Sequence, residues 1–173
     1  MRVSSVLASL FVLAALLATA ASAAAPSYAP EAPQLPHARM KAVPAKLEVA
    51  KLTGFSGIAT DPTGAGIARV QVALVLAASA KAGGAATCQE LENARGRFKT
   101  VKAVRGNCPL LWLTATGTAR WSFKLRTVLP PGRYVVYSRA VGSAGLAEEG
   151  FSRAAGNRFG FRLLAPEPAR RSR

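Results

Sequence analysis

The sequence predicts an all-β domain, an antiparallel sandwich of about seven to nine short strands. Apolar and polar side chains alternate in several short segments, as they do in residues 121–125. Turn residues separate these segments at intervals of about 8–12 residues. No segment after residue 23 shows a convincing helical period of apolar residues. A small closed barrel is the alternative, because the number of strands does not distinguish the two folds.

The first 23 residues have the pattern of a secretory signal peptide. Arg2 gives a positive start, residues 6–17 form an uncharged apolar run, and Ala21-Ser22-Ala23 is a small-x-small cleavage site. The run is shorter than the ~20 apolar residues that a membrane-spanning helix needs. We therefore expect cleavage, no stable membrane anchor afterwards, and a location in the extracellular space or the cell envelope.

Removal of residues 1–23 leaves about 150 residues, enough for one domain with its own core. Residues 24–46 contain few large apolar groups, and five prolines interrupt them: Pro26, Pro30, Pro33, Pro36 and Pro44. Such a segment predicts a disordered, semi-rigid spacer. The domain is expected at residues 47–165, followed by a basic disordered tail at residues 166–173.

The strands follow from the alternation and from the turns between them. Val70, Val72 and Leu74 share one face of an extended chain, which is typical of a half-buried strand. Asp61-Pro62-Thr63-Gly64 predicts a turn, and Asn93-Ala94-Arg95-Gly96 predicts the turn of a hairpin. The expected strands, in chain order, are 47–52, 55–60, 69–76, 87–91, 97–101, 110–113, 121–125, 134–141 and 158–164.

Tyr134 follows the Pro-Gly turn of residues 129–132, which is the spacing of a tyrosine corner. In that motif the tyrosine hydroxyl binds a backbone group a few residues upstream. An ordinary core tyrosine after a turn is the alternative interpretation.

Two further motifs accompany this tyrosine: residues 57–64 read GIATDPTG ahead of Val70 and Val72, and residues 131–136 read PGRYVV ahead of Ser138-Arg139-Ala140. With these motifs the chain, from about Leu52 to Leu164, resembles bacterial secreted Ig-like domains of the fibronectin-III-like kind. The resemblance implies an Ig-like β-sandwich that works as a non-catalytic interaction module.

The chain departs from this family pattern after Arg139-Ala140, where Gly142 and Leu146 replace the usual aspartate and asparagine. Asp61 is the only aspartate in the sequence, and Ca²⁺ needs several oxygen ligands. We therefore expect no calcium site.

The chain contains two cysteines, Cys88 and Cys108. An even pair in a small exported domain predicts a disulfide, which would stabilise the fold by roughly 3 kcal/mol. A zinc site is not expected, because these thiols and the single histidine, His37 in the predicted spacer, cannot complete a tetrahedron. The spacing also differs from the Cys-x-x-Cys of redox proteins. We expect no metal and no cofactor.

The sequence offers no catalytic constellation, because one histidine and one aspartate cannot form a folded Ser-His-Asp or Cys-His arrangement. Two pairs of glutamates, Glu90 with Glu92 and Glu148 with Glu149, stand close together. Such pairs can hydrolyse glycosidic bonds, but they are expected here as solvated charges on surface loops. We predict that the protein is not an enzyme.

The formal net charge is +15, which favours association with polyanions. The candidate polyanion-binding residues are Arg95, Arg97, Lys99, Lys102 and Arg105. Three of them, Arg95, Arg97 and Lys99, would project from one face of an extended strand. The alternative is an exposed sheet face whose charges prevent edge-to-edge pairing. Trp112 and Trp121 are expected in the core, with sugar stacking as the alternative.

These observations predict a secreted, non-catalytic Ig-like interaction module of the bacterial cell envelope or extracellular space. Its partner is expected to be a protein or a cell-wall polymer, without specific nucleic-acid recognition. One alternative is a polyanion-binding protein that uses the basic hairpin face, and another is an accessory domain of an exported enzyme.

Overall fold

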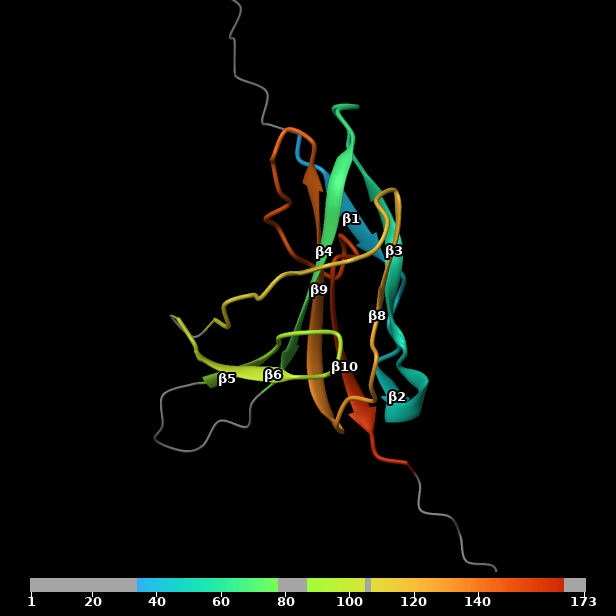
Figure 1. Ribbon diagram of the computed structural model, residues 1–173, viewed down its shortest axis with the longest axis vertical. Coiled ribbons are helices and arrows are strands. Elements are labelled where there is room, and N and C mark those ends of the chain that lie inside the picture. Colours follow the sequence, from blue (N-terminus) through green and yellow to red (C-terminus); the bar gives the residue numbers. More distant parts are fainter. Residues whose placement is uncertain (1–33, 78–86, 105–106, 167–173) are drawn as a thin grey trace, which may run out of the picture. The chain divides into compact units, whose positions relative to one another are not determined.

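The computed structural model describes residues 34–77, 87–104 and 107–166, and within them the chain forms two β-sheets (Figure 1). The predicted signal peptide, residues 1–23, lies outside this part. The described residues form ten strands, with a 3-10 turn at Val49–Lys51: β1 His37–Met40, β2 Lys46–Glu48, β3 Gly54–Thr60, β4 Ile67–Leu76, β5 Thr87–Leu91, β6 Phe98–Lys102, β7 Leu113–Thr114, β8 Arg120–Lys124, β9 Gly132–Gly142 and β10 Arg158–Leu164.

The smaller sheet has the strand order β1-β3-β8, and both of its pairings are antiparallel. Gly57 stands at its centre, where a Cβ atom would lie 2.1 Å from the carbonyl oxygen of Arg39 and 2.7 Å from the ring of Trp121. Glycine thus allows the Trp121 indole to lie against the middle strand. The indole nitrogen donates to the carbonyl oxygen of Ile58 at 3.2 Å.

The larger sheet has the order β2-β10-β9-β4-β5-β6, with β7 paired to β4. Its centre is the long antiparallel pair β4 and β9. Strand β2 pairs with β10 in parallel, so the sheet is mixed and the expectation of a purely antiparallel structure is corrected. In Figure 1 the β5–β6 hairpin runs across the direction of β9 and β10.

The two sheets enclose one hydrophobic core, to which both contribute alternate side chains. Phe55 of the small sheet packs against Phe161 of the large one, with ring centroids 6.1 Å apart, and Tyr134 stacks on Phe161 at 5.5 Å. The most completely buried apolar residues of the core are Ala38, Val70, Val72, Leu74, Leu91, Leu129, Tyr134, Val136, Ala140 and Leu163. The strands of the described residues form two sheets and not one closed barrel.

Tyr134 binds back to the chain as the sequence predicts. Its hydroxyl donates to the carbonyl oxygen of Pro130 at 2.7 Å, while its ring lies 1% exposed in the core. Burial raises the pKa of Tyr134 to about 12, so the hydroxyl keeps its proton and remains a donor. The bond fixes the turn before β9 to the first buried residue of that strand.

The all-β prediction is confirmed, and β5 and β10 have their expected bounds. Three details are corrected. The predicted spacer includes β1, because His37–Met40 pairs with β3 and buries Ala38 and Met40. Segment 47–52 forms the end of β2 and a 3-10 turn instead of one strand. The second half of strand β4 is buried on both faces, since Ala73 and Val75 are also covered, whereas Arg69 in the first half is exposed.

No helix among the described residues is long and apolar enough to cross a membrane.

We expect Tyr134→Phe to lower the free energy of unfolding by about 1 kcal/mol, because it removes one hydrogen bond and keeps the buried ring. Tyr137→Phe is the matched control, since that hydroxyl only accepts a 3.4 Å contact from Arg158 at the surface. Urea unfolding of both variants measures the difference. Equal effects of the two substitutions would refute the role assigned to the Tyr134 hydroxyl.

Candidate functional site

The β5–β6 hairpin carries most of the cations that the sequence singled out. Its turn closes through the amide of Gly96, which donates to the carbonyl oxygen of Asn93 at 3.1 Å. Gly96 has φ +79°, a backbone conformation that residues with a Cβ atom rarely adopt. The Asn93 side chain accepts from the Arg95 amide at 3.0 Å, which orders the turn further.

The hairpin presents Arg95, Arg97, Lys99 and Lys102 as exposed side chains. The sequence predicted that Arg95, Arg97 and Lys99 share one face of an extended strand, and this is wrong for Arg95. Arg95 lies in the turn, because the Gly96 conformation ends the extended chain before β6 begins. Lys102 points to the opposite face from Lys99, because side chains alternate along a strand. Arg105 lies outside the described residues.

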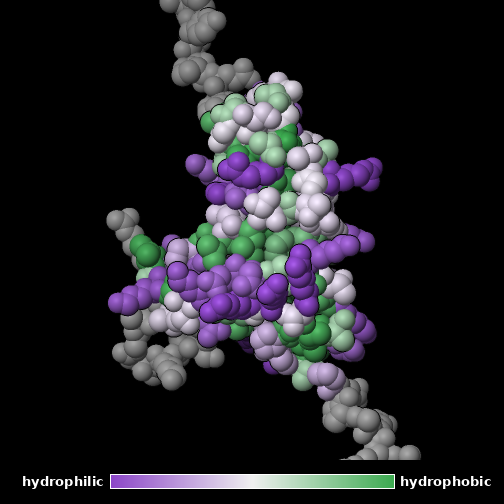
Figure 2. Space-filling model, in the orientation of Figure 1, coloured by the Kyte–Doolittle hydropathy of each residue, from purple (hydrophilic) through white to green (hydrophobic). Residues whose placement is uncertain are grey.

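One carboxylate lies beside these cations at the surface. Glu92 pairs with Arg97 at 3.2 Å, and both side chains are exposed. Such an exposed pair contributes about 0–1 kcal/mol and is screened by salt. The hairpin therefore keeps a strong positive charge, and Figure 2 shows hydrophilic side chains gathered over it.

Arg126 lies beside this hairpin, in the loop after β8, and no sequence pattern singled it out. Its amide donates to the carbonyl oxygen of Ala94 at 2.7 Å, which fixes that loop to the turn. Arg126 and Arg95 line an open depression of about 360 Å³ together with Asn93 and Ala94. We use the name basic hairpin for Arg95, Arg97, Lys99, Lys102 and Arg126.

The predicted disulfide is confirmed. Cys88 of β5 joins Cys108, and their Cα atoms are 5.6 Å apart. The bond holds the segment before Trp112 against the hairpin. Close to it the amide of Leu111 donates to Glu90 Oε2 at 2.9 Å.

Glu90 is 4% exposed on β5, so the prediction of a solvated loop residue is wrong for it. Its second oxygen, Oε1, is buried and has no hydrogen-bond partner among the described residues. Burial raises the pKa of this carboxyl; the Leu111 amide and the charge of Lys99 lower it by smaller amounts.

The two tryptophans have different environments. Trp121 is 3% exposed and belongs to the core, as predicted. Trp112 is half-buried, and the guanidinium of Arg139 lies 4.2 Å from its ring centroid while the ring of Phe151 lies at 5.5 Å. Arg139 is held in turn by the side-chain oxygen of Gln71 at 2.9 Å. The chain's own side chains thus cover the Trp112 ring.

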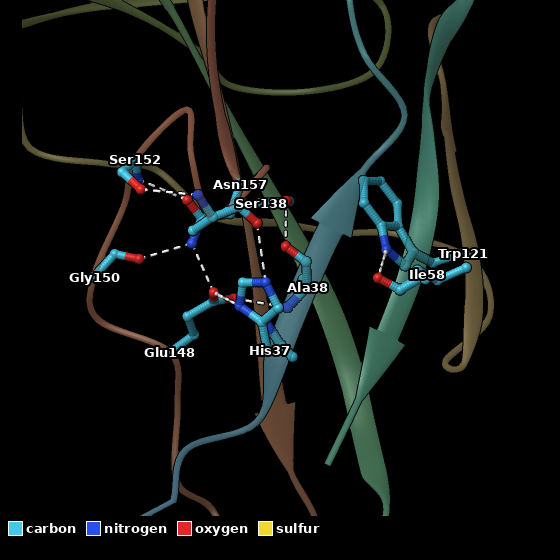
Figure 3. A network of polar contacts seen from close by, with 11 residues as sticks. His37, Ala38, Ile58, Trp121, Ser138, Glu148, Gly150, Ser152 and Asn157 are labelled. Carbon is cyan, nitrogen blue, oxygen red and sulfur yellow. Dashed lines mark hydrogen bonds and ion pairs between the residues drawn. The ribbon is translucent and has the colours of Figure 1, made fainter. Parts of the chain in front are cut away.

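Glu148 is the second glutamate for which the solvated-loop prediction is wrong, since it is 5% exposed. Its Oε2 accepts from the amide of Ala38 in β1 at 2.9 Å and from that of Ala140 in β9 at 3.3 Å. Its Oε1 accepts from the Asn157 side chain at 2.6 Å and contacts His37 Nδ1 (Figure 3). One carboxylate therefore joins the two sheets.

His37 and Asn157 extend this network to the loop before β10. His37 Nε2 lies 3.0 Å from the carbonyl oxygen of Ala155, so His37 is a structural residue of β1 and not part of a spacer. Asn157 also donates to the carbonyl oxygen of Gly150 at 2.7 Å and accepts from the Ser152 amide at 2.8 Å. These hydrogen bonds hold the loop before β10 against β1.

No group of three or more histidine, cysteine or acidic side chains in the described part is arranged to hold a metal ion. An open depression of about 300 Å³ lies beside β1 and β3, and it is lined by His37, Arg39, Ile58, Thr60, Ala154 and Ala155. Neither this depression nor the one beside Arg126 has a glutamate or aspartate in its lining.

No protein-family model matches the chain, and no curated protein or solved structure does so either.

We expect Glu148→Gln to lower the free energy of unfolding by about 2–4 kcal/mol, since an amide cannot accept from all four partners. Glu149→Gln is the matched control, because the neighbouring side chain is exposed and its loss should change stability by less than about 0.5 kcal/mol. Chemical denaturation measures both. Similar stabilities of the two variants would contradict the role of Glu148.

Glu90→Gln should become increasingly stable relative to the wild type as the pH rises. A raised pKa means that the folded state binds a proton more tightly than the unfolded state. Wild-type stability therefore falls as the pH increases from about 4 through the raised pKa, whereas glutamine stays neutral. Urea unfolding between pH 4 and pH 8 measures this, with Glu92→Gln as the exposed control. A difference that is independent of pH would refute the prediction.

Proposed function

We propose that the protein is a secreted, non-catalytic Ig-like module that binds anionic polymers of the cell envelope or the extracellular space. The Ig-like interpretation is supported by the two sheets around one core and by the hydrogen bond from Tyr134 to Pro130. This bond has the form of the tyrosine corner of Ig-like sandwiches. The motifs of residues 57–64 and 131–136 support the same interpretation.

Secretion is supported by the Cys88–Cys108 disulfide, because disulfides persist mainly in oxidising compartments. The signal-peptide pattern of residues 1–23 points in the same direction. The two observations are independent, since one concerns a leader and the other the folded domain.

The basic hairpin is the observation that carries the choice of ligand. It brings five cations from two loops and a strand to one end of the large sheet, with Glu92 as the exposed carboxylate among them. Clustered charges of one sign attract flexible polyanions without a shaped pocket. The alternative, that these charges only protect the edge strand β6 from pairing, predicts no dependence of polymer binding on them.

We expect the protein to bind an anionic resin, or a cell-wall preparation, with a retention that falls as salt increases. Replacing Arg97, Lys99 and Lys102 by glutamine should shift elution to clearly lower salt. The control is the triple substitution of Lys41, Arg120 and Lys124, which are exposed cations outside the hairpin. Both variants lose three charges, so equal shifts, or an unchanged hairpin variant, would show that the hairpin is not the binding site.

A further inference from the structure

Three cations lie side by side on the outer face of the large sheet. Arg162 of β10 pairs directly with Arg133 of β9 on one side and with Lys46 of β2 on the other. Residues directly opposite each other in a sheet project from the same face, and neighbouring strands are about 4.8 Å apart. All three side chains are exposed. We call these three residues the cation row.

This arrangement is unfavourable unless something compensates it, because like charges directly opposite each other destabilise a sheet. None of the three cations has an ion-pair partner among the described residues. Glu48 follows Lys46 on the same face of β2, but it pairs with Lys51 at 3.4 Å. The charges of the cation row are thus left without a carboxylate.

Arg158 adds a fourth cation to this face, four residues before Arg162 on the same strand. Its guanidinium lies 5.7 Å from the ring centroid of Tyr137, the residue opposite it on β9. A ring holds a guanidinium without neutralising it. The outer face of β9 and β10 therefore carries guanidinium groups at both ends of β10.

We propose that the cation row binds phosphate or sulfate groups of an anionic polymer. The guanidinium groups of Arg133 and Arg162 can each donate two parallel hydrogen bonds to such a group, while Lys46 contributes a point charge. The bound anion would relieve the repulsion within the row. The inference rests on the proposed function for the class of ligand and adds a second site to it.

Lys99 of the basic hairpin lies on the same face of the large sheet as the cation row. Across the sheet, Val135 pairs with Val75, Val75 with Glu90, and Glu90 with Lys99. Paired residues project from the same face, and Arg133 shares this face because it lies two residues before Val135, so Lys99 projects from the same side as Arg133. A polymer that spans the sheet contacts both sites, and the second contact is then intramolecular, which strengthens binding.

The test compares two double substitutions that remove the same charge. One is Arg133→Gln with Arg162→Gln, and the control is Arg120→Gln with Lys124→Gln on β8, in the other sheet. The probes are inorganic polyphosphate and heparin, which separate phosphate from sulfate groups. For at least one of them we expect the row variant to bind about tenfold more weakly than the control, which is 1.4 kcal/mol.

Two measurements distinguish a site from a general effect of charge. The slope of log affinity against log salt for polyphosphate should shrink by about 1.4–1.8 in the row variant, as for two lost phosphate contacts in nucleic acids. At low salt and without polymer, the row variant should melt at a higher temperature than the wild type, whereas the control should not.

Equal affinities of the two double variants for both probes would overturn the inference. If the hairpin variant then still binds more weakly than its own control, the proposed function stands without the second site. Failure of the wild-type protein to bind either probe would overturn both proposals.

Discussion

The joining of the two sheets by the Glu148 carboxylate is the interaction on which the rest of the fold depends. Strand β1 pairs with β3 on one side only, and its other edge would leave the Ala38 amide without an acceptor in the core. Glu148 accepts from this amide and from Ala140 of the opposite sheet. A buried carboxylate costs several kcal/mol unless hydrogen bonds surround it, and here four partners do so. The network is therefore a condition for closing the core, and it fixes the loop that leads into β10.

The burial of carboxylates also changes the charge of the surface. The sequence contains eight acidic residues against 23 lysines and arginines, and two of the acids, Glu90 and Glu148, are buried. Glu148 accepts hydrogen bonds from the amides of Ala38 and Ala140. Glu90 accepts from the amide of Leu111, in the segment that follows Cys108. The outer surface is left with fewer negative charges than the composition suggests. Exposed cations such as Arg133 and Arg162 lie next to each other, and no described carboxylate forms an ion pair with them, which favours an anionic ligand over a neutral one.

The sequence predicted those features that depend on local pattern. Strand β10 alternates strictly, and the Tyr134 bond follows from a short turn, so both could be recognised without tertiary information. The disulfide followed from having only two cysteines. Strand β1 was missed because four residues among prolines carry too little alternation to be recognised. Beyond its pairing with β3, it is held by contacts with residues more than a hundred positions away, including Glu148.

The basic hairpin and the cation row could likewise be predicted only as far as local sequence pattern determines them. A run of basic residues predicted the cationic hairpin. The positive φ of Gly96 places Arg95 in a turn and not on the predicted strand face, and Arg126 comes from a loop that is distant in the sequence. The sequence pattern did not predict the cation row, because only the register of three strands brings Lys46, Arg133 and Arg162 together. Register depends on the whole sheet, and a slip of one residue would send these side chains to the opposite face.

Amide hydrogen exchange of the unmodified protein tests the role of Glu148 most directly. If its carboxylate accepts from the edge strand in solution, the Ala38 amide exchanges only through global opening. Its protection then equals that of Val136, which lies in the centre of the large sheet. Exchange of the Ala38 amide as fast as that of an exposed loop amide, while Val136 stays protected, would contradict the account.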